Sequence, residues 1–351
     1  MTSMTLTDAI TVIGGIDTHK ELHVAAVVDR DDGRLLDTKE FSTTRAGYRA
    51  LLRWLTSYGQ LHAVGIEGTG SYGAGITRHL TEAGVRVYEV DRPDRSDRRR
   101  RGKSDTIDAE MAARAVISGR RLSLPKAKNG KVEALRVLRL TRATAIRSRV
   151  KALQLLRNHA ISAPAEVRDM VRSLTRMQLI RTVAAWRPDY DDVDHPATAT
   201  RIAMRSLARR ILELNDEIAD LDDLIEPLVC DVGAALLQRP CIGIETAGQL
   251  LVTAGGNPER LRSEPAWAML CGTAPLPASS GATDRHRLNR GGDRQANRAL
   301  HMIAISRLRT DGATRAYAAR KTAEGKSKRE IIRCIKRYIA REVYPLLKPT
   351  D

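Results

Sequence analysis

The chain has 351 residues, 42% of them hydrophobic, and carries 59 Lys and Arg against 42 Asp and Glu, a formal net charge of +17. That length accommodates two or three domains with real cores, and a pI near 10.1 makes a polyanion the first partner to consider. No apolar run approaches the ~20 residues that span a bilayer, and the four scattered cysteines favour neither a zinc site nor a disulfide framework, so we expect a cytosolic protein without a membrane partner.

The first ~120 residues alternate strand and helix patterns. The order is β-β-β-α-β-α-β-α, which predicts a ribonuclease-H-like α/β fold. The expected strands are 11–17, 22–28, 34–42, 62–67 and 85–90, and the expected helices are 44–58, 72–83 and 105–117.

Four acidic residues occupy positions that suit a divalent metal in this fold. Asp17 and Glu67 each end an apolar strand, and Asp105 and Asp108 open the last helix on one face. Acidic residues in a first helical turn also complement the helix dipole, which explains the helix pair but not the two strand residues. Carboxylate oxygens are the ligands that Mg²⁺ prefers, and two ions can serve one phosphoryl displacement.

Basic residues are concentrated just before the acidic pair and in a helical segment that follows it in the chain. Arg98, Arg99, Arg100 and Arg101 directly precede the acidic pair, and we interpret them as phosphate contacts beside the site. Residues 131–157 predict an amphipathic basic helix with Leu135, Leu138, Ile146, Val150 and Leu153 as its buried stripe and Arg139, Arg142 and Arg147 as nucleic-acid contacts. Only 3% of residues are aromatic, so we expect contacts chiefly to phosphates and sugars.

A heptad series from Met204 to Leu228 predicts a coiled coil that Pro227 should end. The seam either pairs with the basic helix of the same chain or joins two chains, and we expect a homodimer or homotetramer. From residue 281 onward, 18 Lys and Arg stand against 7 Asp and Glu. We expect three parts: a catalytic domain at 1–125, the basic helix and coiled coil at 126–229, and a mainly helical C-terminal domain at 230–351.

Several motifs resemble one known family. They are Ile16-Asp-Thr-His-Lys, Glu67-Gly-Thr-Gly-Ser-Tyr, Lys103-Ser-Asp-Thr-Ile-Asp-Ala-Glu and, far downstream, Ser279-Ser-Gly followed by Arg290-Gly-Gly-Asp-Arg-Gln-Ala-Asn-Arg-Ala-Leu. Together they resemble the DEDD transposases of bacterial insertion sequences, also described as bridge-RNA-guided recombinases. The resemblance covers both ends of the chain, while 125–228 matches only in character.

The resemblance implies a Holliday-junction-resolvase-like domain with Mg²⁺ on Asp17, Glu67, Asp105 and Asp108. It also implies a serine nucleophile that forms a covalent 5′-phosphoserine with DNA; this maps to Ser280, with the adjacent Ser279 as the other candidate. The implied partners are donor and target DNA and a guide RNA, in a bacterial, nucleoid-associated protein. We expect Arg285, Arg287, Arg290, Arg294 and Arg298 to hold the strands nearby. Two alternatives stay open, a resolvase whose acids activate water and a non-catalytic nucleic-acid-binding protein.

Overall fold

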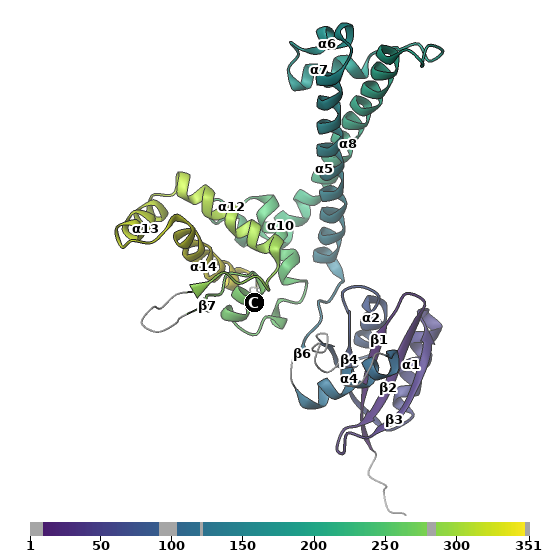
Figure 1. Cartoon of the computed structure of the whole chain (residues 1–351). Helices are drawn as coiled ribbons and strands as arrows, with labels where there is room; N and C mark the ends of the chain where they lie inside the picture. Colours follow the sequence, from purple (N-terminus) through teal and green to yellow (C-terminus); the bar gives the residue numbers. More distant parts are fainter. Residues whose placement is uncertain (1–9, 91–103, 120–121, 279–285, 348–351) are drawn as a thin grey trace, which may run out of the picture. The chain divides into compact units, whose positions relative to one another are not determined.

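The computed structural model describes residues 10–90, 104–119, 122–278 and 286–347 (Figure 1). Within it the chain divides into two compact units. The first comprises residues 1–128 together with 255–263, and the second comprises residues 129–254 and 264–351. Apart from residues 255–263, the middle and C-terminal segments that we expected to part at residue 229 fall in one unit.

The first unit is built on a six-stranded mixed sheet in the order β3-β2-β1-β4-β5-β6. The strands are β1 (Thr11–Thr18), β2 (Leu22–Asp29), β3 (Leu35–Ser42), β4 (Gln60–Ile66), β5 (Val87–Val90) and β6 (Leu122–Ser123). The first three form an antiparallel meander, whereas β1, β4 and β5 run parallel. This confirms the ribonuclease-H-like order that the sequence predicts.

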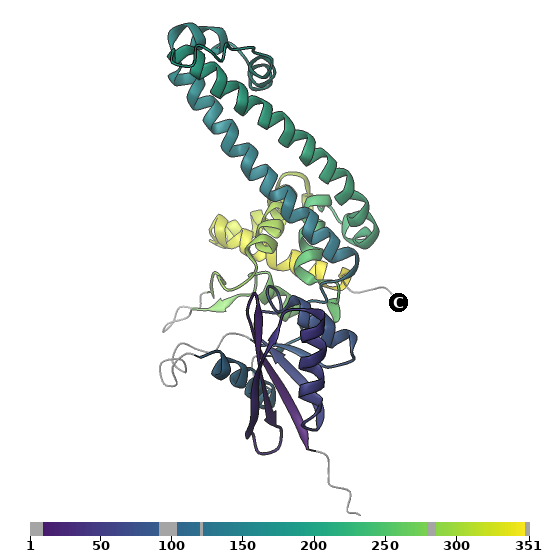
Figure 2. The ribbon, with the colours of Figure 1, turned by 90° about the vertical axis from the view of Figure 1, so that its right-hand side faces the viewer.

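Helices cover both faces of this sheet (Figure 2). Helices α1 (Arg45–Thr56) and α2 (Ala74–Glu82) bury Leu51, Leu55, Ile76 and Leu80 against one face. Helix α4 (Asp105–Ser118) packs on the opposite face through alanines. Its bounds follow from its caps: Ser104 accepts a hydrogen bond from the Ile107 N–H, and Gly119 ends the helix in the left-handed conformation.

A short segment of the C-terminal half, residues 255–263, packs with the first unit. It contains the 3-10 helix η1 (Pro258–Arg260). The Asn257 side chain donates to the Pro125 carbonyl at 2.9 Å and accepts from the Ala127 N–H at 2.9 Å. The Arg260 Nε donates to the Leu124 carbonyl at 3.3 Å. The first unit is therefore completed by residues far along the chain.

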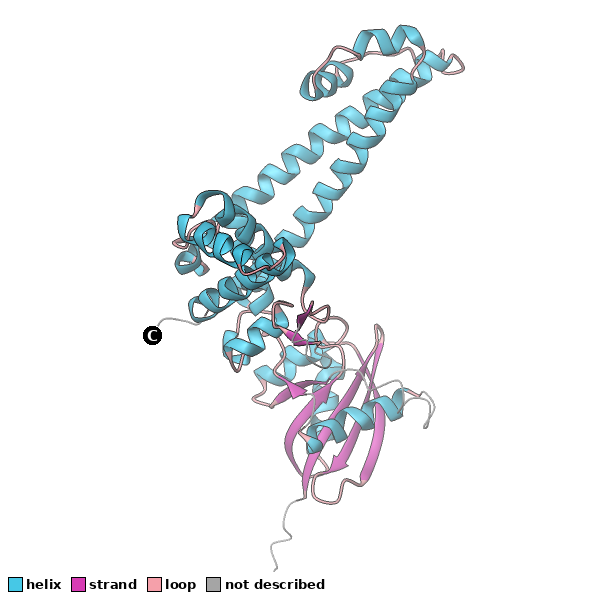
Figure 3. Ribbon diagram, turned by 60° about the vertical axis from the view of Figure 1, so that its left-hand side comes forward, coloured by secondary structure: helices cyan, strands magenta, loops and turns pink. Residues whose placement is uncertain are grey.

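The second unit begins with two long helices, α5 (Gly130–Ser162) and α8 (Pro196–Val232), which lie side by side (Figures 1 and 3). Lys131 pairs with Asp231 and Arg149 with Asn215, so the helices run antiparallel. Helices α6 (Ala165–Val171) and α7 (Arg176–Ala184) pack at one end of the pair. The heptad seam is therefore intramolecular, the first of the two pairings that the sequence left open.

Two details of the long helices correct the sequence analysis. Pro227 does not end α8, which continues to Val232. Ile225 and Val229 are buried on either side of Pro227, and we infer that this packing outweighs the backbone hydrogen bond that proline cannot donate. Val150 is 58% exposed and is not part of the buried stripe of α5; the small side chains of Ala145 and Ala152 are buried instead.

The remaining elements of the second unit form a helical C-terminal part. They are α9 (Ala234–Leu237), α10 (Ile244–Ala254), α11 (Glu264–Leu270), β7 (Leu276–Pro277), β8 (His286–Arg287), α12 (Arg294–Thr310), α13 (Gly312–Ala323) and α14 (Lys328–Leu346). Strands β7 and β8 pair antiparallel, and residues 279–285 between them in the sequence lie outside the described part. Among the helices formed by the described residues, none is long and apolar enough to cross a membrane.

Candidate metal site of the first unit

Side chains alternate across β1, so Ile13, Gly15 and Asp17 share one face of the sheet. Ile13 is buried against Ala113 of α4, whereas Val12 and Ile16 belong to the core under α1 and α2. The face that carries Asp17 is therefore the one that α4 covers. Because α4 opens with Asp105 and Asp108, its position on this face decides where those carboxylates lie.

Two glycines allow α4 to approach the sheet closely. A Cβ on Gly15 would lie 2.0 Å from the Ala109 carbonyl oxygen and 2.5 Å from the Ala113 nitrogen. A Cβ on Gly65 of β4 would lie 2.4 Å from the Ala112 carbonyl oxygen. Any side chain at these positions would meet helix backbone, which has no rotamer to change. The glycines of β1 and β4 thus set the depth at which α4 sits.

The result is a cluster of three potential metal ligands at the end of β1. The His19 Nε2 lies 3.2 Å from an Asp17 carboxylate oxygen and 3.4 Å from an Asp105 carboxylate oxygen. One ligand atom from each of these residues lies within 4.8 Å of the other two, and among the described residues this is the one group of three or more His, Cys, Asp or Glu side chains placed in this way. Asp17 is 9% exposed, while the Asp105 side chain is 52% exposed, so the cluster opens to solvent on the helix side.

The electrostatics of Asp17 fit a bound cation. Burial raises the pKa of its carboxyl; His19 opposes this shift, and the neighbouring Asp108 and Asp105 add to it. The fold therefore holds several carboxylates close together in a partly desolvated place, which costs free energy when they are ionised. A divalent cation would supply the missing positive charge, and carboxylate and imidazole are both known ligands for such ions.

The other two predicted acids, Asp108 and Glu67, lie near Asp17 on different elements. Asp108 is 8% exposed and close enough to Asp17 to raise the pKa of its carboxyl. Glu67 directly follows β4, and Ile66 pairs with Ile16, so Glu67 lies one register step beyond, opposite Asp17. Its N–H donates to the Ile16 carbonyl at 3.1 Å, and its carbonyl accepts from the Thr18 hydroxyl at 2.8 Å. The structure thus brings Asp17 and Asp105 together with His19, and places the backbone of Glu67 directly after the end of the adjacent strand β4.

His19 is the residue of this site that the sequence reasoning did not assign. It follows Asp17 by two positions and stands within a motif already noted, but no periodicity distinguishes it from an ordinary surface histidine. Its side chain is 46% exposed, and it joins the cluster because α4 places Asp105 3.4 Å from its Nε2.

The predicted basic residues fall into three groups. Arg98, Arg99, Arg100, Arg101 and Arg285, like Ser279 and Ser280, lie outside the described residues. A second group, exposed on α5, β8, the loop after β8 and the start of α12, comprises Arg147, Arg287, Arg290, Arg294 and Arg298. That exposure suits contact with a nucleic acid, which stays a prediction for each of them.

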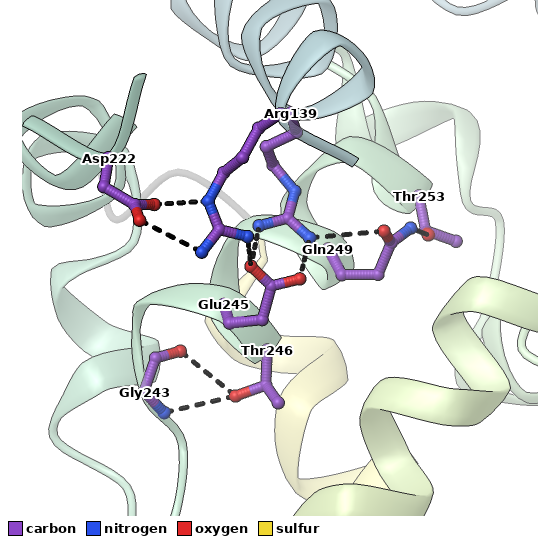
Figure 4. Close-up of polar contacts among 8 residues, drawn as sticks. Arg139, Asp222, Gly243, Glu245, Thr246, Gln249 and Thr253 are labelled. Carbon is purple, nitrogen blue, oxygen red and sulfur yellow. Dashed lines mark hydrogen bonds and ion pairs between the residues drawn. The ribbon is translucent and has the colours of Figure 1, made fainter. Parts of the chain in front are cut away.

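Arg139 and Arg142 form the third group, and both are engaged inside the second unit. Figure 4 shows Arg139 with Glu245. The guanidinium of Arg139 donates to both carboxylate oxygens of Glu245, at 2.9 and 3.1 Å, and its side chain is only 10% exposed. Arg142 pairs with Asp222 of α8 and also reaches Glu245 at 3.2 Å. These two arginines therefore join α5 to α8 and α10.

Fold and site together define a ribonuclease-H-like domain with a cluster of potential metal ligands, followed in the chain by a helical second unit. Two family models match the chain: one described as Transposase, of the DEDD IS110 type, over residues 14–161, and one described as Transposase IS116/IS110/IS902 family over residues 233–319. The chain belongs to the IS110 family of transposases.

Two relatives from insertion elements agree with this assignment. The chain is 29% identical over 145 residues to the insertion element IS900 uncharacterized 42 kDa protein of Mycobacterium paratuberculosis. It is 33% identical over 146 residues to the insertion element IS110 uncharacterized 43.6 kDa protein of Streptomyces coelicolor. Each match covers 40% of this chain but only 36% and 35% of the relatives, respectively, little more than a third of their length.

Proposed function

We propose that the protein is a DNA transposase that cleaves and rejoins the donor and target DNA of an insertion element by divalent-metal-assisted nucleotidyl transfer. The observation that carries this proposal is the convergence of Asp17, His19 and Asp105 at the carboxyl end of β1 in a ribonuclease-H-like sheet. Family membership supports the same activity.

In this proposal Asp17 and Asp105 hold the ion, with Asp108, Glu67 and His19 as further ligands or neighbours. Mg²⁺ is the ion we propose, in one or two copies, because most of the donors are carboxylate oxygens. When bound, it would supply positive charge to a phosphate oxygen and favour loss of a proton from an attacking hydroxyl. The buried position of Asp17 strengthens its attraction for such a cation, since less water screens the charge.

We propose Ser280 as the nucleophile of the reaction. Its Oγ forms a bond to the DNA phosphorus, the bond from phosphorus to the 3′ oxygen breaks, and the serine proton passes to that oxygen, directly or through water. The products are a 5′-phosphoserine and a free 3′ hydroxyl, and the reverse reaction with another 3′ hydroxyl joins strands without ATP. Support comes from the Ser-Gly motif and from the exposed arginines Arg287, Arg290 and Arg294 that follow it in the chain.

A denaturing gel with labelled DNA tests this chemistry. The substrate carries the ends of the insertion element and a label on the 3′ end of each strand, and it is incubated with Mg²⁺ or with EDTA. We expect a slow band that protease treatment converts to a fast one, in Mg²⁺ only. Ser280→Ala should abolish this band while the matched variant Ser279→Ala retains it, and the reverse pattern would move the nucleophile to Ser279.

The gel also separates the two alternative functions. A resolvase whose acids activate water would release fragments with free 5′ ends and no protein attached. A non-catalytic binding protein would leave the DNA intact. Asp17→Asn should abolish cleavage but retain nucleic-acid binding and the circular dichroism spectrum, because the change removes charge without altering the size of the side chain.

We further propose that a noncoding bridge RNA guides the protein and that it acts as a homodimer or homotetramer. The net charge of +17 and the exposed arginines support binding of a second nucleic acid. Sequencing of RNA that co-purifies with the protein tests guidance: one short RNA from beside the gene is expected, and a random mixture would contradict it. Light scattering of the same preparation measures the oligomeric state.

A further inference from the structure

A cavity of about 290 Å³ lies within the second unit, bounded by α13, α14, β8 with the two residues after it, and the loop before β7. One face of α14 forms much of its wall, with Glu330, Arg333, Cys334, Arg337 and Tyr338 recurring at helical spacing. Protein pockets for small organic groups begin at roughly this size, about 300 Å³. The cavity is therefore large enough for one planar ring with its substituents and too small for a duplex.

A buried lysine contributes to this wall. Lys336 is 6% exposed, and its ammonium donates to the Asn297 side-chain oxygen at 2.8 Å. The orientation of that amide is fixed, because its nitrogen donates to the carbonyls of Cys271 and Gly272 at 2.9 and 3.0 Å. Among the described contacts, the single acceptor for this buried cation is thus a neutral oxygen.

An unneutralised buried charge is expensive, and Arg333 on the same wall adds to the cost. Burial and the neighbouring Arg333 both lower the pKa of Lys336. Arg333 lies 3.9 Å from Glu330, a weak pairing, and Arg337 is held by Glu264. The wall therefore carries more positive than negative charge, an arrangement that an anion entering the cavity would stabilise.

Two tyrosines supply an aromatic surface beside these cations. Tyr317 of α13 and Tyr338 of α14 meet edge to face with ring centroids 5.5 Å apart. The Arg320 guanidinium lies 5.4 Å from the Tyr317 ring centroid, whereas Tyr338 remains 54% exposed. The chain has only 8 Tyr, 3 Trp and 1 Phe, so two tyrosines that line one cavity are a notable concentration.

We propose that this cavity holds one unpaired nucleotide of a nucleic-acid strand, with a phosphate toward Lys336 and Arg333 and the base against the Tyr338 ring. A phosphate supplies the missing negative charge, and a base supplies a flat ring that stacks on an exposed tyrosine. His286, Arg287 and Leu288 also line the cavity, and they follow the segment that carries Ser280 in the sequence. The proposal rests on the proposed function, because it assigns part of the strand that the transposase handles.

Binding of short oligonucleotides tests the proposal without requiring cleavage. The probes are fluorescent dT6 and rU6, with a duplex of equal length as comparison, measured by anisotropy on the full chain carrying Ser280→Ala. Tyr338→Ala should weaken binding of a single-stranded probe about tenfold, the size expected for loss of one stacked base. Tyr338→Phe should bind like the parent, and so should Tyr190→Ala, which removes a tyrosine of similar exposure, 59%, outside the cavity.

Lys336→Met keeps the length of the side chain and removes its charge. It should weaken binding and lower the slope of log affinity against log salt by about one, as expected for one lost phosphate contact. Preference for dT6 would identify the strand as DNA and preference for rU6 as RNA, and either supports the site. Parental affinity in both Tyr338→Ala and Lys336→Met would overturn it, as would an equal loss in Tyr190→Ala.

A cross-linking experiment gives a local readout. A 5-iodouracil base in the probe should cross-link to Tyr338 under ultraviolet light, and peptide mapping identifies the labelled residue. Labelling confined to other residues would also overturn the proposal. The binding assay separates this proposal from the proposed function. A protein that forms no adduct in the gel assay would still bind the probe in a way that depends on Tyr338.

Discussion

Replacing Gly15 with alanine tests whether the close approach of α4 to β1 builds the acidic cluster. The new Cβ would lie 2.0 Å from the Ala109 carbonyl oxygen, about 1.4 Å short of the 3.4 Å at which ordinary contact begins. The obstructing atoms belong to the helix backbone, so no side chain can turn away. Either α4 retreats by about that distance or β1 distorts, and both outcomes separate Asp105 from Asp17.

Both the stability and the activity of the Gly15→Ala variant should fall. Overpacking of a closely packed interior costs about 1–3 kcal/mol, and we expect the upper end because backbone must move. Urea unfolding followed by circular dichroism should therefore show a loss of about 3 kcal/mol in the free energy of unfolding. A displacement of about 1 Å at a catalytic group lowers rates about 100-fold, so adduct formation in the gel assay should fall by that factor. Calorimetric titration with Mn²⁺ should show weaker binding as well.

Gly70→Ala is the matched control, since a Cβ there meets nothing within 4 Å and Gly70 lies in the same unit. It should retain parental stability. Ala109→Gly should fail to rescue Gly15→Ala, because the clash involves the Ala109 carbonyl and not its methyl group. Parental stability, metal affinity and activity in Gly15→Ala would refute the view that this contact positions the acids.

The strand order was predictable because the physics that selects it is local. Apolar runs separated by turn residues mark β1, β2 and β4, and the Thr44, Ser104 and Gly119 caps mark helix ends. The predicted bounds differ from the observed ones by at most two residues in this region, because frayed ends depend on hydrogen bonds made elsewhere. β6 was not predicted, because a strand of two residues is too short to show a periodic pattern.

The site was only partly predictable, since its geometry depends on packing between distant segments. Asp17 and Asp105 stand out by their places on a strand end and a helix start. Nothing local to His19 indicates that it lies 3.4 Å from Asp105, 86 positions later. Gly15 carries a signal that the sequence prediction did not use, because a glycine in a buried strand indicates close approach of another backbone.

The ion pairs of Arg139 and Arg142 within the second unit were not predictable from the sequence for a similar reason. Arg139 and Arg142 look like any other cations of an amphipathic helix. Their partners Glu245 and Asp222 lie 80 or more positions away in the sequence, so only the fold reveals that the charges are paired. A helical pattern indicates which face is apolar, but it does not separate a cation that binds a ligand from one that joins helices.

Two further predictions concern stability. Arg142→Met should destabilise the second unit by about 1 kcal/mol, with a smaller effect at 0.5 M salt, because the side chains of its partners Asp222 and Glu245 are 46% and 66% exposed. Additive losses in the double variant with Asp222→Asn would show that the Arg142–Asp222 pair contributes nothing. His23 is fully buried and stacked on Tyr48, and burial lowers its pKa from 6.5 to about 4. The unfolded chain therefore binds the proton more readily than the folded one between these values. Stability from this group is complete above pH 6.5 and is lost as the pH falls toward 4, by roughly 3 kcal/mol in total. Urea unfolding of His23→Leu should lose this part of the acid sensitivity, and a variant whose stability still falls in parallel with the parent between pH 7.5 and 4.5 would show that another group is responsible.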